Sequence, residues 1–269
     1  PLYHWSQLEL KEYFGCETEI CERNAEKIWA ECCGYMSEHK FTPRDLIESS
    51  NVTHVFTTNE IFDDLSVFGK IREKGYSFEV IPAFRADKIM NIEAEAYNLY
   101  ADRLGDVKDL SGLEEKIADR LDAFVGEGTR AADIALQSVY PVAERKDAEK
   151  IIAKSRAGKE VTAAEAAVFK GYLTYFLMRL YAEKGIVTEL HIGAMRNNNS
   201  VMLKKLGLDT GYDSMAEEDG IGNMACLFDR LYQEGKLPKT IVFNLNPKMN
   251  EEIITLLGCF QSGEAKGKL

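Results

Sequence analysis

Polar and ionisable side chains follow five stretches of apolar, β-branched sequence. In a parallel α/β sheet, ligands bind beyond the carboxyl ends of the strands, so side chains in these positions gather at one edge. One such residue alone could cap a helix, but five in the same relation to a strand favour a binding or catalytic site. The residues are Asn59-Glu60, Arg85 with Asp87 and Lys88, Asp133, His191, and Asn244 with Asn246.

His191 is the most distinctive of these residues. It follows the strand-like run that starts at Ile186 and precedes Gly193, where glycine lets a backbone or a ligand approach closely. Four polar residues, Arg196 to Asn199, come soon after. A neutral imidazole in this position is typical of a metal ligand or a proton shuttle. A histidine that is hydrogen-bonded within the core gives the same pattern, so all three interpretations remain open.

Arg85 and the asparagines each have a functional and a structural interpretation. A guanidinium binds a carboxylate or a phosphate through paired hydrogen bonds, which would attract an anionic substrate to a chain of net charge −11. The alternative for Arg85 is an ion pair with Asp87. The Asn197–Asn199 run and Asn246 could bind sugar hydroxyls or cap the helices that follow.

The elements that must position these residues alternate between strand and helix after residue 50. This alternation favours a parallel sheet built from right-handed β-α-β units. Neither G-x-G-x-x-G nor G-x-x-x-x-G-K-[ST] occurs, so Rossmann and P-loop nucleotide sites are unsupported and the (β/α)8 barrel is the commonest remaining architecture. A complete barrel needs eight strands. The five expected strands cover residues 52–57, 78–84, 131–136, 186–192 and 240–244.

Helices are expected throughout residues 1–50 and between the strands. Two capping boxes mark the start of a helix, Thr42 with Asp45 and Thr162 with Glu165. In each box a threonine precedes an acidic residue by three positions, so that both side chains can bind free backbone N–H groups.

Composition limits the class of protein. The chain has 44 acidic and 33 basic residues among 269, and 45% of its residues are hydrophobic. Nucleic-acid binders need a basic face and a membrane span needs about 18 apolar residues, so we expect neither partner. The sequence shows no charged-then-apolar leader and no C-x-x-C pair among its six cysteines. We therefore expect a cytoplasmic protein with free thiols.

Several segments resemble the uronate isomerases, also called glucuronate isomerases. The most specific is E-L-H-I-G-A-M-R-N-N-N, from Glu189 to Asn199, which resembles the fifth-strand segment of that family. The other matches agree in order, and together they extend over essentially the whole chain. They are Pro1–Trp5, Thr57-Thr58, Pro82–Arg85 with Asp87-Lys88, Leu206–Ser214, Leu237–Thr240, Asn244–Pro247 and Gly258–Gln261.

The resemblance implies part of a distorted (β/α)8 barrel of the amidohydrolase superfamily, with about five parallel strands and extra helices. Residues 51–269 would form an incomplete barrel with strands two to six, and residues 1–50 a helical segment packing on it. Such enzymes interconvert aldose and ketose hexuronates, D-glucuronate with D-fructuronate and D-galacturonate with D-tagaturonate. They bind one divalent metal ion, commonly zinc, through an H-x-H after strand one, a histidine after strand five and an aspartate after strand eight.

Within such an isomerase, His191 matches the strand-five metal ligand. From charge and position, we expect Arg85 to bind the carboxylate of the sugar, and Arg196, Asn197, Asn199 and Asn246 to orient its hydroxyls. The catalytic base is expected to be the strand-eight aspartate, outside this chain. A homo-oligomer is compatible with this interpretation.

Departures from the family pattern keep two alternatives open. The chain has no H-x-H and lacks the family's W-W-F and D-S-R segments, so we expect the remaining metal ligands outside it and this segment alone to be inactive. Gln7 replaces a family histidine, Asn59 follows the two threonines where the family has D-D-P, and Ile134 stands where it has the histidine of S-D-H-G. The alternatives are a non-catalytic α/β binding protein and another metal-dependent enzyme of the superfamily.

Overall fold

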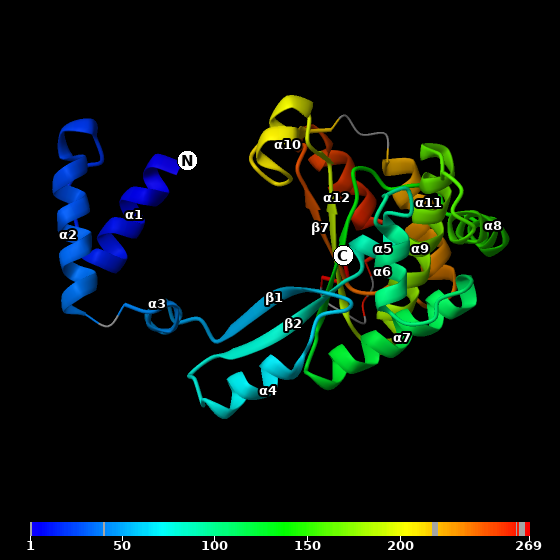
Figure 1. The fold of residues 1–269 in the computed structure, drawn as a ribbon, viewed down its shortest axis with the longest axis horizontal. Helices are drawn as coiled ribbons and strands as arrows, with labels where there is room; N and C mark the ends of the chain where they lie inside the picture. Colours follow the sequence, from blue (N-terminus) through cyan, green and yellow to red (C-terminus); the bar gives the residue numbers. More distant parts are fainter. Residues whose placement is uncertain (1, 40, 217–219, 262, 264–266) are drawn as a thin grey trace. The chain divides into compact units, whose positions relative to one another are not determined.

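The computed structural model describes residues 2–39, 41–216, 220–261, 263 and 267–269 (Figure 1). The chain divides into two compact units. The first contains Pro1–Val55 and Arg72–Val80, and the second contains Phe56–Ile71 and Ile81–Leu269. The residues that follow the strands and were predicted to form a site all belong to the second unit.

The first unit is mainly helical, as expected. The predicted capping box at its third helix is confirmed, because Thr42 and Asp45 bind each other's backbone N–H groups. An aromatic cluster of Phe14, Tyr35 and Phe41 packs between its elements, with ring centroids 4.8–5.8 Å apart. The elements are α1 (Leu2–Phe14), η1 (Glu22–Asn24), α2 (Ala25–Glu38) and α3 (Pro43–Ser49).

A five-stranded sheet in the order β1-β2-β3-β4-β7 confirms the predicted α/β class. The pairings β2 with β3, β3 with β4 and β4 with β7 are parallel. The spatial order follows the chain order without the reversal of a doubly wound sheet, which is the arrangement of consecutive strands in a (β/α)8 barrel. The strands are β1 (His54–Glu60), β2 (Glu79–Arg85), β3 (Ala131–Ala135), β4 (Val187–Ile192) and β7 (Thr240–Asn244).

Helices connect the strands, as the alternating pattern predicts. They are α4 (Ser66–Glu73), α5 (Asp87–Met90), α6 (Tyr97–Arg103), α7 (Leu110–Gly126), α8 (Arg145–Arg156), α9 (Ala163–Lys184), α11 (Ile221–Gln233), η2 (Pro247–Met249) and α12 (Asn250–Gly258). The sequence interpretation missed three short elements between β4 and α11. These are α10 (Ser200–Leu206) and the antiparallel pair of β5 (Ala194–Met195) and β6 (Ser214–Met215).

The core lies on one face of the sheet. Along β4, Thr188, Leu190 and Ile192 are buried, whereas Glu189 and His191 on the other face are partly exposed. Phe84 of β2 is fully buried and makes edge-to-face contacts with aromatic rings of α7 and α9, at centroid distances of 5.1 and 6.1 Å. Each such buried side chain stabilises the fold by about 1.5–3 kcal/mol. The packing fixes one face of the strands and leaves the other for chemistry.

Helix α9 has the second predicted capping box, which is confirmed. Thr162 accepts the backbone N–H of Glu165, and the Glu165 carboxylate accepts the backbone N–H of Thr162. Lys154 and the two Thr162 hydrogen bonds lower the pKa of Glu165 to about 2. None of the helices in the described part of the chain is long and apolar enough to cross a membrane.

Candidate functional site

A cavity of about 1150 Å³ opens at the carboxyl ends of the strands in the second unit. It is lined by the last residue, or the one before it, of every strand in the sheet. The polar residues predicted from the sequence therefore do gather at one edge. The strand-end residues that line the cavity are Glu60, Arg85, Ala135, His191 and Asn244.

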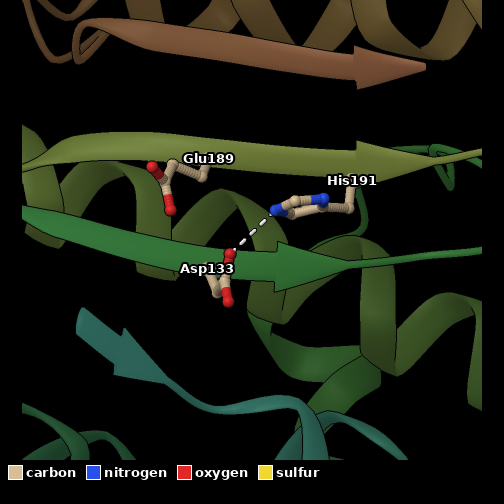
Figure 2. Close-up of side chains that lie close together, drawn as sticks. All are labelled: Asp133, Glu189 and His191. Carbon is tan, nitrogen blue, oxygen red and sulfur yellow. Dashed lines mark hydrogen bonds and ion pairs between the residues drawn. The ribbon is translucent and has the colours of Figure 1, made fainter. Parts of the chain in front are cut away.

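His191 forms a cluster with Asp133 and Glu189 (Figure 2). Parallel pairing of β3 with β4 places Asp133 beside Glu189 and Ala135 beside His191. The Nε2 atom of His191 lies 2.8 Å from Oδ1 of Asp133. Figure 2 shows the His191 ring directed back along β4 toward Asp133, with the Glu189 carboxylate on the other side. The cluster reaches the cavity through His191, since the Asp133 side chain is only 10% exposed.

Two neighbours fix the orientation of the His191 ring. Phe243 of β7 stacks on it with a centroid distance of 4.6 Å and an interplanar angle of 8°. Register explains this contact, because His191 pairs with Phe243 just as it pairs with Ala135 on the other side. Partial burial raises the pKa of Glu189, and the nearby Asp133 carboxylate raises it further. The cluster therefore concentrates negative charge around an imidazole of fixed orientation.

The donor atoms of this cluster suit a divalent metal ion. One ligand atom from each of Asp133, Glu189 and His191 lies within 4.8 Å of the others. Imidazole nitrogen with carboxylate oxygen is a ligand set used by zinc and other divalent metals. Sequence analysis identified His191 as a ligand and Asp133 as a strand-end residue, but it missed Glu189. The signal was present, because residues two apart on a strand share a face.

Arg85 lines the cavity and also forms the ion pair that was its alternative interpretation. Its Nε atom lies 2.6 Å from Oδ2 of Asp87. Oδ1 of Asp87 accepts the backbone N–H of Ala135, which ties this pair to the end of β3. Burial raises the pKa of Asp87, although Arg85 opposes that effect. Burial alone would lower the pKa of Arg85, but Asp87 outweighs it and the net direction is upward.

Arg196 and Asn197 line the cavity from the segment between β5 and α10. Nη1 of Arg196 lies 2.7 Å from Oδ2 of Asp213, and the backbone N–H of Asn197 donates to Oδ1 of the same carboxylate at 2.8 Å. The Asn197 hydrogen bond, followed by Arg196, lowers the pKa of Asp213. Both predicted residues are thus placed at the cavity by one acidic side chain.

Asn199 and Asn246 have the capping role that was their alternative interpretation. The Asn199 side chain accepts the backbone N–H of Met202 at the start of α10. The Asn246 side chain accepts the backbone N–H of Lys248 and donates to the carbonyl oxygen of Ala216. Neither asparagine belongs to the described lining of the cavity. Their predicted contact with substrate stays a prediction.

Comparison with known proteins identifies the family. The family model described as glucuronate isomerase matches residues 1–269. Uronate isomerases from Bacillus pumilus and Clostridium acetobutylicum are 38% and 39% identical to the chain over its full length. The chain spans 58% and 59% of the length of these two relatives.

Solved structures agree with the sequence comparison. Uronate isomerase from Thermotoga maritima matches 97% of this chain with a TM-score of 0.90 and 26% identity, and the match covers 58% of that protein. Glucuronate isomerase from Caulobacter crescentus matches 96% of it with a TM-score of 0.87 and 25% identity, over 55% of its own length. With its strand order, its strand-end cavity and a family match from the first residue to the last, the chain belongs to the glucuronate isomerase family.

Proposed function

We propose that the intact protein that carries this chain isomerises hexuronates between their aldose and ketose forms. D-Glucuronate with D-fructuronate and D-galacturonate with D-tagaturonate are the expected pairs. The observation that carries the proposal is the placement of His191 beside Asp133 at a strand-end cavity, in a chain that matches the isomerase family throughout.

The charges of the cavity suit an anionic sugar bound next to a cation. Arg85, Lys170 and Arg196 line it, and each is paired with an acidic side chain. Arg85 is the cation that we assign to the substrate carboxylate, because it stands at a strand end and a guanidinium binds carboxylates in a bidentate manner. Asp87 would keep the guanidinium in place before the substrate arrives.

Isomerisation moves a proton between C2 and C1 of the open-chain sugar through an enediol. A divalent metal ion, zinc in our proposal, would stabilise negative charge that develops on the sugar oxygens. His191 would hold this ion, with Asp133 and Glu189 as the further donors that this chain offers. Phe243 restrains the imidazole plane by stacking. The group that removes the carbon-bound proton is expected outside this chain.

The test uses the intact protein, with purified D-glucuronate and D-galacturonate as substrates. His191→Ala should lower bound zinc and reduce kcat/KM by at least about a hundredfold, as expected when a metal ligand is removed. His39→Ala is the matched control, since this histidine lies at the exposed end of α2. Zinc content and turnover unchanged by His191→Ala would overturn the metal assignment.

Two further outcomes concern the alternatives from the sequence. Binding of a hexuronate without any turnover by the intact protein would favour the non-catalytic binding protein. Residues 1–269 expressed alone should not turn over either hexuronate, because the expected base and the H-x-H ligands are not in this sequence. Self-association and a cytoplasmic location stay predictions from the sequence.

A further inference from the structure

Glu60, at the carboxyl end of β1, has one carboxylate oxygen without a hydrogen-bond partner. Its Oε1 atom lies 3.5 Å from Nζ of Lys88, whereas its Oε2 atom is buried and accepts no hydrogen bond. The residue lines the cavity described above. A carboxylate only accepts hydrogen bonds when ionised, so a buried oxygen without a donor costs free energy.

Comparison with similar atoms sets Glu60 apart. Among the described residues, the other buried side-chain oxygens without a partner are hydroxyl groups, on Tyr97, Tyr181 and Thr188. None of these three residues belongs to the described lining of the cavity. Leaving an acidic oxygen unpaired costs more than leaving a hydroxyl unpaired. An incoming ligand with hydrogen-bond donors would remove that cost at Glu60 alone.

The surroundings of Glu60 hold its carboxyl at the cavity wall. Its backbone N–H donates to Oδ2 of Asp63 at 3.0 Å, which fixes the chain just after the strand. The charged groups that face the carboxyl are Lys88 and Asp87 of α5 and Arg85 of β2. Burial raises the pKa of Glu60, Lys88 opposes this, and Asp87 adds to it.

We propose that Glu60 binds the substrate, with its unpartnered oxygen accepting a hydrogen bond from a hydroxyl group of the sugar acid. The inference rests on the proposed function, because a hexuronate brings several hydroxyl donors into the cavity. The last torsion of a glutamate side chain is broad, so a small rotation of the carboxyl is enough to expose Oε2. Glu60 is also one of the positions where this sequence departs from the D-D-P of the resembled family.

The first test measures KM and kcat of intact Glu60→Ala and Glu60→Gln proteins with D-glucuronate. Loss of one hydrogen bond to a charged acceptor should raise KM about tenfold in Glu60→Ala and leave kcat within about threefold of the wild type. Asp64→Asn is the matched control, because this exposed acidic residue of the same loop caps the start of α4 and does not line the cavity. It should leave both constants unchanged.

A pH series separates substrate binding from a structural role. Glutamine imitates the neutral carboxyl, so Glu60→Gln and wild type should have similar KM values below the raised pKa of Glu60. Above it the wild-type carboxylate becomes a stronger, charged acceptor, and the ratio of the two KM values should grow with pH. A structural defect would give a ratio that does not change with pH.

The outcomes are distinct. The inference is overturned if both Glu60 variants keep the wild-type KM, or if the ratio stays constant across the pH series. Lack of turnover by the wild-type protein would instead overturn the proposed function. Calorimetric titration with D-glucuronate then decides the role of Glu60, since unchanged affinity in the variants, or no affinity in the wild type, contradicts it. Glu60→Gln is close to isosteric and remains informative if Glu60→Ala does not fold.

Discussion

The two ends of the block from His191 to Asn199 are held in place by different forces. His191 lies on a central strand and is paired with β3 on one side and β7 on the other. The segment after Gly193 depends on side chains. Asp213 binds Arg196 and the Asn197 backbone, and Nδ2 of Asn198 donates to the carbonyl oxygens of Met195 and Tyr212 and to the Ser214 hydroxyl.

This difference bears on how the two ends contribute to a site. The position of His191 follows from backbone pairing and a buried sheet face, so no single side-chain hydrogen bond determines it. The position of Arg196 depends on one partly exposed ion pair, which is worth about 0–1 kcal/mol. We therefore expect the strand end to be rigid and the following segment to move more easily. Substitutions can test each side of that comparison.

The largest expected effect comes from the strand. Leu190 is fully buried between Glu189 and His191 on the opposite face of β4. Leu190→Ala should lower the free energy of unfolding by about 2–5 kcal/mol, because it leaves a cavity beneath the site. Urea unfolding measures this, with Ile241→Ala as the control, since Ile241 on β7 is 48% exposed. Equal losses in both variants would contradict the assignment of the buried face.

The junction between the two ends gives the next effect. Gly193 has φ +88°, and a Cβ atom there would lie 3.3 Å from Oδ1 of Asn244. Gly193→Ala should cost about 1–3 kcal/mol through backbone strain and crowding. Gly207 is a matched control, because its φ is +90° and a Cβ atom there has open space. A loss in thermal stability equal to that of Gly207→Ala would mean that crowding by β7 is unimportant.

A smaller and local effect is expected in the loop. Asp213→Ala removes the acceptor of both the Arg196 side chain and the Asn197 backbone. Amide hydrogen exchange of residues 196–199 should become at least about tenfold faster, while that of α9 stays unchanged. Protection in the loop that survives the substitution would show that the backbone of β5 and β6 is sufficient to hold it.

The smallest effect is the pH dependence of the same loop. The pKa of Asp213 is lowered in the folded protein, so its contribution to stability is present above the ordinary aspartate pKa, which is about 3.9. That contribution is lost as the pH falls through the lowered value. Exchange in residues 196–199 should accelerate under acid in the wild type, and the acceleration should be much weaker in Asp213→Asn.

Local sequence signals predicted much of the fold. Both capping boxes, at Thr42 and Thr162, form as predicted, because a cap depends on residues three positions apart. All five strands of the main sheet coincide with predicted runs. Helix α10 was missed because its seven residues are too few to show a helical period, although Asn199 is a standard capping residue.

The candidate site was predicted only in part. His191 and Asp133 were identified from their places at strand ends, but their contact depends on the register of two strands that local sequence does not specify. Glu189 was missed because an acidic residue inside a strand has no turn or cap to mark it. The choice between substrate and structural roles for Arg85, Asn199 and Asn246 needed the observed hydrogen bonds.

The contact between Asp133 and His191 joins residues that are 58 positions apart. Helices α8 and α9 lie between them in the chain, and no hairpin can bring them together early. Contacts of such high sequence separation require loop closure before they contribute any stability, which slows folding. The cluster should therefore appear only when β3 and β4 have docked. Perturbation of the Asp133–His191 pair can then serve as a probe of the last stage of folding, separate from its role in chemistry.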